Sequence, residues 1–120
     1  MPGRAKYLMI ASMDIDSEHE SLFNEVYDTE HIPSLLKVPG VLRVARYKRE
    51  ELVINIGGQA KKIVAANEPM YSAVYEIESP EVLTSADWAR AVEEGRWATQ
   101  VRPHTTNRRH VLLRVISDTE

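Results

Sequence analysis

The side chains best suited to proton chemistry in this sequence stand next to each other, at Glu30 and His31. The apolar spacing predicts a helix from about residue 18 to residue 31, and on its wheel Glu30 lies between Phe23 and Val26 in the apolar face. Burial disfavours a charged carboxylate, so a Glu30 that faces a cavity should have a raised pKa, towards the range useful for proton transfer. If the helix ends one turn earlier, Glu30 instead points to water.

His31 and Tyr27 lie about one step further round the same helix, beside Asn24. An imidazole can relay protons near neutral pH, although at a helix C-terminus it can equally bind the last carbonyls. Tyr27 could donate a hydrogen bond to a developing oxyanion, or it could be an aromatic residue at the core edge. We therefore nominate His31, Glu30 and Tyr27 as catalytic residues.

Further candidates lie on expected strands and in a polar stretch. Tyr71 and Tyr75 share one face of a strand, and they could line a cavity together with Arg46. Cross-strand packing is the alternative role for these tyrosines. His104 could close the mouth of a cavity or simply occupy a loop. The expected substrate-binding residues are Asn24, Tyr71, Tyr75, Arg46 and His104.

Other chemistries lack the residues that they need. The chain has no cysteine, which removes thiolate nucleophiles, disulfides and iron–sulfur ligation. No His-x-x-x-His pair is present, and His104 and His110 are separated by an expected junction of loop and strand. The Gly57-Gly58 pair lacks the Lys-Ser/Thr that follows a phosphate-binding loop. The sequence therefore predicts no metal and no cofactor.

Composition narrows the class of protein and its partners. With 43% hydrophobic and 28% charged residues in 120, the chain is typical of one globular domain spanning 1–120. The net charge of −3 argues against a nucleic-acid partner. No apolar run approaches the roughly 20 residues that a membrane span needs. Residues 1–4 lead into no apolar secretory segment, so we expect a cytoplasmic protein.

Periodicity and cap signals give the order of elements. Ser17 and Glu20 form a capping-box pattern, Pro33 should end the first helix and open a short second one, and Ser85 should cap another. Residues 50–67 carry turn signals, with a possible strand at 52–56, and 61–66 could extend the strand that follows. Residues 97–108 look polar and irregular. The expected strands are 6–13, 41–47, 70–77 and 109–116, and the expected helices are 18–31, 33–36 and 86–95.

The order β-α-β-β-α-β predicts an α+β, ferredoxin-like fold, with a four-stranded antiparallel sheet and helices on one face. The strands are apolar on both faces, since Leu8 and Ile10 alternate with Tyr7, Met9 and Ala11. An uncovered apolar sheet face needs a partner. A homodimer that packs sheet against sheet and closes a barrel is the symmetric solution.

The string Tyr-Asp-Thr-Glu-His-Ile-Pro at 27–33, followed by Leu35-Leu36 and by Val-Pro-Gly-Val at 38–41, resembles the EthD-like branch of the dimeric α/β barrel superfamily. The stretch 70–80 resembles that family's third strand. Similar proteins often carry Trp where this chain has Val26. The resemblance implies a dimer and favours His31 as a residue that lines the pocket.

The superfamily that this branch belongs to includes monooxygenases, cyclases, isomerase-like enzymes and haem-degrading enzymes, so the fold does not fix the reaction. We expect a cofactor-independent enzyme that acts on a small aromatic or carbonyl-bearing metabolite by acid–base proton transfer. Isomerisation, cyclisation, a lyase step and oxygenation all stay open. One alternative is an accessory or ligand-binding protein without turnover, and another is a purely structural dimer.

Overall fold

The computed structural model describes residues 5–119. Residues 1–4, on which the expectation of no secretory segment rests, lie outside the described part. Short 3-10 or π-helical turns cover Ser17–His19, Tyr27–His31, Pro80–Thr84, Trp97–Val101 and Arg102–His104. The strands are β1 (Tyr7–Ile15), β2 (Val41–Lys48), β3 (Leu52–Ile56), β4 (Gln59–Ile63), β5 (Tyr71–Ile77) and β6 (Thr105–Arg114), and the helices are α1 (Glu20–Val26), α2 (Ile32–Leu36) and α3 (Ala86–Ala91).

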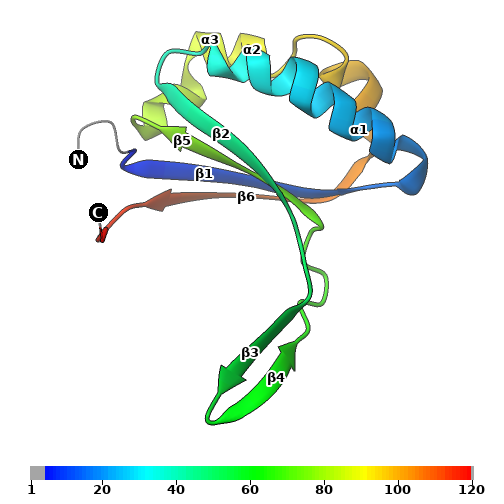
Figure 1. Cartoon of the computed structure of the whole chain (residues 1–120). Helices are drawn as coiled ribbons and strands as arrows, with labels where there is room; N and C mark the ends of the chain where they lie inside the picture. The colour runs from blue at the N-terminus through cyan, green and yellow to red at the C-terminus, as the bar shows by residue number, and fades with distance from the viewer. Residues whose placement is uncertain (1–4, 120) are drawn as a thin grey trace.

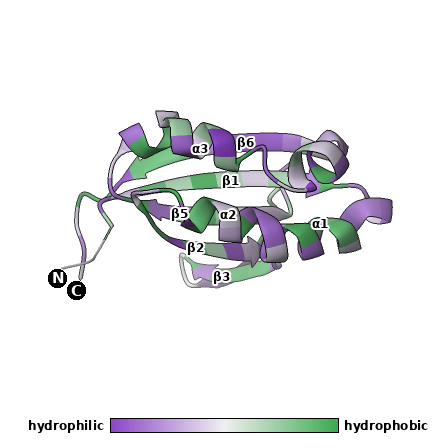
Figure 2. Ribbon diagram, turned by 90° about the horizontal axis from the view of Figure 1, so that it is seen from above, coloured by the Kyte–Doolittle hydropathy of each residue, from purple (hydrophilic) through white to green (hydrophobic). Residues whose placement is uncertain are grey.

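The main sheet is antiparallel and has the order β2-β5-β1-β6. All three helices lie on one of its faces (Figures 1 and 2). Alternate residues of β1 and β5 are buried beneath them, because successive side chains of a strand point to opposite faces. This is the α+β, ferredoxin-like arrangement that the sequence predicts.

The first helical segment does not stop at His31, and the prediction that Pro33 would end it is wrong. The backbone stays helical from residue 17 to residue 36, with a π-helical turn at Tyr27–His31. Ile32 keeps helical angles of φ −61° and ψ −48°, and its N–H donates to the carbonyl of Tyr27. A π turn is wider than an α turn, which relieves the clash between a proline ring and the preceding turn.

The cap of this segment also differs from the expectation. Asp16 is the N-cap, and its Oδ1 accepts a hydrogen bond of 3.0 Å from the His19 N–H. The expected Ser17 lies inside the turn. Further along the chain, Ser85 does cap α3 as predicted, since its Oγ accepts from the Trp88 N–H at 3.1 Å.

The segment after α3 is more ordered than the sequence suggests. α3 ends at Ala91 rather than Gly95, and Gly95 instead takes a left-handed φ of +67°. Trp97–Val101 forms a helical turn that buries Trp97 and Val101, and β6 begins at Thr105 instead of residue 109. Because Trp97 and Val101 are four residues apart, they lie on one side of the turn and pack inward together.

Residues 52–63 form a separate hairpin of β3 and β4, which extends from the main sheet away from the helices (Figure 1). Gly57 and Gly58 make the turn with φ of +62° and +82°, the angles of a type I′ hairpin turn. The expected strand at 52–56 is confirmed. Its partner is the strand at 59–63, rather than an extension of β5.

The sheet face opposite the helices carries apolar cross-strand neighbours. Leu8 pairs with Leu113, and Ile10 pairs with Val111 and Val74. Val111 and Leu113 are each 47% exposed. None of the described helices covers this face, and none is long and apolar enough to cross a membrane.

Candidate ligand cavity

A cavity of about 370 Å³ lies between the helices and the sheet. β1, β5 and β6 form its floor, the π turn of the first helical segment forms one wall, and α3 with the Trp97–Val101 turn forms the other. Most of its lining is aromatic or aliphatic. The residues that matter for chemistry are Tyr27, His31, Tyr75, Arg102, Arg108 and His110.

His31 is the buried polar residue of this wall and is only 5% exposed. Its ring stacks on the Trp97 ring, with 4.3 Å between centroids and 20° between planes, and meets the edge of Tyr27 at 5.0 Å. Its Nδ1 is buried and has no hydrogen-bond partner within the described residues. Burial lowers the pKa of His31 to about 3, and the charges of Arg102 and Arg108 add to this effect. The imidazole is therefore neutral near pH 7.

The four-residue spacing of Tyr27 and His31 explains why both line the cavity. Side chains four positions apart lie on one face of a helix, and they still do so in the π turn that covers these residues. Such turns occur frequently at functional sites. The sequence string that predicted a helix end is thus the segment that directs both side chains inward.

Tyr27 and Tyr75 form a hydroxyl pair with 2.8 Å between their oxygens. Burial raises the pKa of both phenols, so both stay protonated near pH 7. One hydroxyl donates to the other, which leaves the proton of the acceptor hydroxyl for a further partner. The pair can therefore offer a hydrogen bond to an oxygen in the cavity.

Glu30 does not face the cavity, and the expectation of a raised pKa is wrong. Its carboxylate accepts hydrogen bonds from the Arg96 N–H at 2.9 Å and from Arg96 Nε at 2.6 Å. These bonds lower the pKa of Glu30, because they stabilise the charged form. The carboxylate ties the first helical segment to the loop before Trp97, which is a structural role.

Three of the expected substrate-binding residues line a separate hollow of about 300 Å³. These are Asn24, Arg46 and Tyr71. Arg46 Nη2 donates to Asn24 Oδ1 at 2.7 Å, and its guanidinium lies 4.6 Å from the centre of the Tyr27 ring. The Tyr71 hydroxyl donates to Glu20. The expected set is therefore divided, and only Tyr75 among the substrate-binding candidates lines the main cavity.

His104 lines neither hollow and instead stacks on His19 beside Asp16. Sequence reasoning also missed residues that do line the main cavity. These include Trp88, which was not nominated, and Trp97, Arg102 and Arg108, which belong to the stretch that was expected to be irregular. The spacing of Trp97 and Val101 within that stretch was the available signal for an inward-facing turn.

No protein-family model matches this chain, and no curated protein matches it. Solved structures do match its fold. An EthD-family protein from Bacillus halodurans is 13% identical, with a TM-score of 0.55 over 92% of this chain and 99% of its own. HapK from Hahella chejuensis is 12% identical, with a TM-score of 0.59 over 95% and 96%. The heme-degrader MhuD from Mycobacterium tuberculosis, solved with two hemes bound in its active site, is 17% identical, with a TM-score of 0.52 over 95% and 99%.

The chain has a ferredoxin-like fold. The likeness to these proteins extends over nearly the whole chain, and an EthD-family protein is among them. The resemblance first drawn from the Tyr27–Pro33 string is thus confirmed at the level of the fold. At these identities the likeness carries the fold alone, so the chemistry of this ferredoxin-like chain rests on its own residues.

Proposed function

We propose that this ferredoxin-like protein is a cofactor-independent enzyme that acts on a small aromatic or carbonyl-bearing metabolite by proton transfer at His31. The observation that carries the proposal is the buried His31 Nδ1, which lacks a partner within the described residues and belongs to the wall of the cavity. A buried polar atom without a partner is rare and calls for an explanation, and a ligand that supplies the missing hydrogen bond is one.

The cavity walls indicate the chemistry of that ligand. The aromatic rings of Trp88, Trp97 and Tyr75 favour a flat, largely apolar molecule. Arg102 and Arg108 favour an anionic group on it, such as a carboxylate, phenolate or enolate. Arg102 is already bound to Glu93 at 2.7 Å, whereas Arg108 forms no ion pair within the described residues. Arg108 is therefore the better candidate anchor.

A bound anion would change the pKa of His31. The positive charges of Arg102 and Arg108 contribute to the low pKa of His31, so an anion between them offsets that contribution and raises the pKa. His31 then becomes a better proton acceptor in the loaded protein than in the empty one. The Tyr27–Tyr75 pair can stabilise a developing oxyanion by donating its remaining hydroxyl proton.

Binding without turnover is the alternative function, and two observations favour it. Glu30, the expected second catalytic group, is held outside the cavity by Arg96. The pKa of His31 in the empty protein is also far below the pH at which a histidine base works best. On this alternative the same cavity holds a metabolite for another protein.

We further propose that the protein works as a homodimer in the cytoplasm. The uncovered sheet face presents Leu8, Ile10, Val74, Val111 and Leu113 side by side. Such a continuous apolar surface is typical of an interface. The absence of cysteine fits a reducing compartment.

The test is a turnover screen by mass spectrometry with small phenols, quinols and β-keto carboxylates. We expect at least one compound to be converted by the wild type and by Glu30→Gln, but not by His31→Ala, with Arg108→Gln raising the KM. Saturable binding without conversion would refute the enzyme proposal and support the alternative, a binding protein without turnover. Iron protoporphyrin binding that depends on His31 would contradict the proposed substrate class. If no compound binds, both functions fail.

A further inference from the structure

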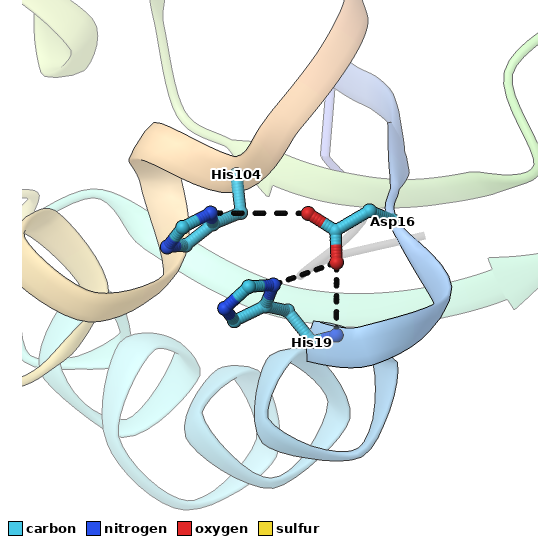
Figure 3. Close-up of side chains that lie close together, drawn as sticks. All are labelled: Asp16, His19 and His104. Atoms are coloured by element: carbon cyan, nitrogen blue, oxygen red, sulfur yellow. Dashed lines mark hydrogen bonds and ion pairs between the residues drawn. The ribbon is translucent and has the colours of Figure 1, made fainter.

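Asp16, His19 and His104 form a cluster at the end of the sheet, outside the ligand cavity (Figure 3). Asp16 directly follows β1, His19 belongs to the turn that opens the first helical segment, and His104 immediately precedes β6. The cluster joins segments far apart in the sequence because the end of β1 pairs with the start of β6, through Ile15 and Thr105.

Both imidazoles direct a ring nitrogen at the same carboxylate. His19 Nδ1 lies 2.6 Å from Asp16 Oδ1, and His104 Nδ1 lies 3.8 Å from Asp16 Oδ2. The two rings are stacked, with 3.6 Å between centroids and 10° between planes. The stacking places both Nδ1 atoms on the side of Asp16, as Figure 3 shows.

These three side chains offer the donor set of a transition-metal site. One ligand atom from each residue can be chosen so that all lie within 4.8 Å of one another. Zinc binds imidazole nitrogen and carboxylate oxygen at about 2.0–2.2 Å, which separates neighbouring ligands of a tetrahedron by about 3.3 Å. The observed separations of 2.6 Å to Oδ1 and 3.8 Å to Oδ2 lie on either side of this value. Since the two rings are stacked nearly parallel, the imidazoles must rotate out of the stack for both nitrogens to converge on one ion.

We propose that Asp16, His19 and His104 bind a divalent transition-metal ion of the zinc class, with a fourth position left to water. Imidazole ligands favour zinc and its neighbours over Mg²⁺ and Ca²⁺, which prefer sites made of oxygen. The side chains are between 29% and 48% exposed, so an ion can reach them. The His19 N–H holds Asp16 Oδ1 at 3.0 Å and orients the carboxylate, as outer hydrogen bonds do in metal sites.

The bound ion would add a link between two parts of the chain that already meet through strand pairing and through the stacked His19 and His104 rings. His104 lies in the same short turn as Arg102, which lines the ligand cavity. Fixing His104 to Asp16 and His19 would also fix the backbone that carries Arg102. The site does not depend on the proposed function, since none of its three ligands lines the cavity.

The test uses the full chain without a histidine tag, first treated with EDTA and then titrated with Zn²⁺ by calorimetry near pH 7.5. We expect one Zn²⁺ per chain, a Tm that rises with Zn²⁺ and falls again with EDTA, and Co²⁺ that gives visible absorption typical of low coordination number. His104→Gln and His19→Gln should each weaken binding by roughly tenfold or more. Asp16→Asn should weaken it as well while preserving an N-cap acceptor.

His110→Gln is the matched control, because His110 lies on β6 outside the cluster and its variant should bind Zn²⁺ as the wild type does. Far-UV circular dichroism without metal checks that each variant folds, and Asp16→Asn serves if a histidine variant does not. Absence of Zn²⁺ binding, or binding that is equal in wild type and in the folded ligand variants, would overturn the proposal. Asp16, His19 and His104 would then contact one another only by hydrogen bonding and ring stacking.

Discussion

Replacing His31 with phenylalanine should remove a specific pH dependence from the stability of this protein. The pKa of His31 is about 3 in the folded state and 6.5 for the unperturbed side chain. The unfolded chain therefore binds a proton more readily than the folded one, and acid favours unfolding. The contribution of neutral His31 to the free energy of unfolding is fully present above pH 6.5, and it is lost progressively as the pH falls from 6.5 towards 3. Phenylalanine keeps the ring against Trp97 and cannot titrate.

The magnitude follows from the two pKa values. At pH 5 the unfolded histidine is mostly protonated and the folded one is not, which destabilises the wild type by about 2 kcal/mol relative to its value at high pH. The variant lacks this loss. The difference in unfolding free energy between the two proteins should therefore shift by about 2 kcal/mol, in favour of His31→Phe, between pH 7.5 and pH 5.

Urea denaturation followed by circular dichroism at pH 7.5, 6 and 5 measures this shift. Both proteins are compared at one concentration, because a dimer's stability depends on it. His110 also has a pKa lowered by burial, but its effect is common to both proteins and cancels. A difference that stays constant across this range would refute the reasoning, since it would mean that His31 titrates alike in the folded and unfolded states.

Three further predictions concern backbone, core and interface. Gly95→Ala should destabilise the protein more than Gly57→Ala, as measured by urea denaturation. Both glycines have a positive φ, which costs an alanine about 1–2 kcal/mol. At Gly95 the new Cβ would also lie 2.6 Å from a carboxylate oxygen, whereas at Gly57 it would meet open space. Tyr27→Phe should cost about 1–3 kcal/mol by leaving the Tyr75 hydroxyl unpaired, and the double Phe variant should cost less than the sum of the single losses. Val111→Arg should turn a dimer into a monomer in sedimentation velocity. Equal losses of stability in the two glycine variants would contradict the first prediction, and additive losses in the tyrosine variants would contradict the second. A Val111→Arg variant that stays dimeric would contradict the third.

The sequence was sufficient for the order of the main strands because alternation and β-branched residues are local signals. Local signals did not predict the end of the first helical segment correctly. Pro33 normally ends a helix, yet the π turn at Tyr27–His31 accommodates it, and no sequence pattern distinguishes a π turn from a break. Glu30 is bound to Arg96 instead of facing the cavity.

The site was predictable where the face of one element determines it, as for Tyr75 on β5. Tyr27 and His31 come from a single turn, and both line the cavity. Arg108 reaches it from β6, and its role depends on how β6 pairs with β1, which the sequence does not specify residue by residue. The same holds for His104, whose neighbours Asp16 and His19 come from the opposite end of the chain.

The central claim, that the cavity holds a small ligand, can be tested with the protein's own fluorescence. The chain has two tryptophans, Trp88 and Trp97, and both line the cavity. Titration with a small phenolic or β-keto carboxylate should change their emission with saturation. Ala11→Phe, which fills the cavity from β1, should abolish the change, and Glu30→Gln should preserve it. A linear response without saturation, or an undiminished response in Ala11→Phe, would contradict the account.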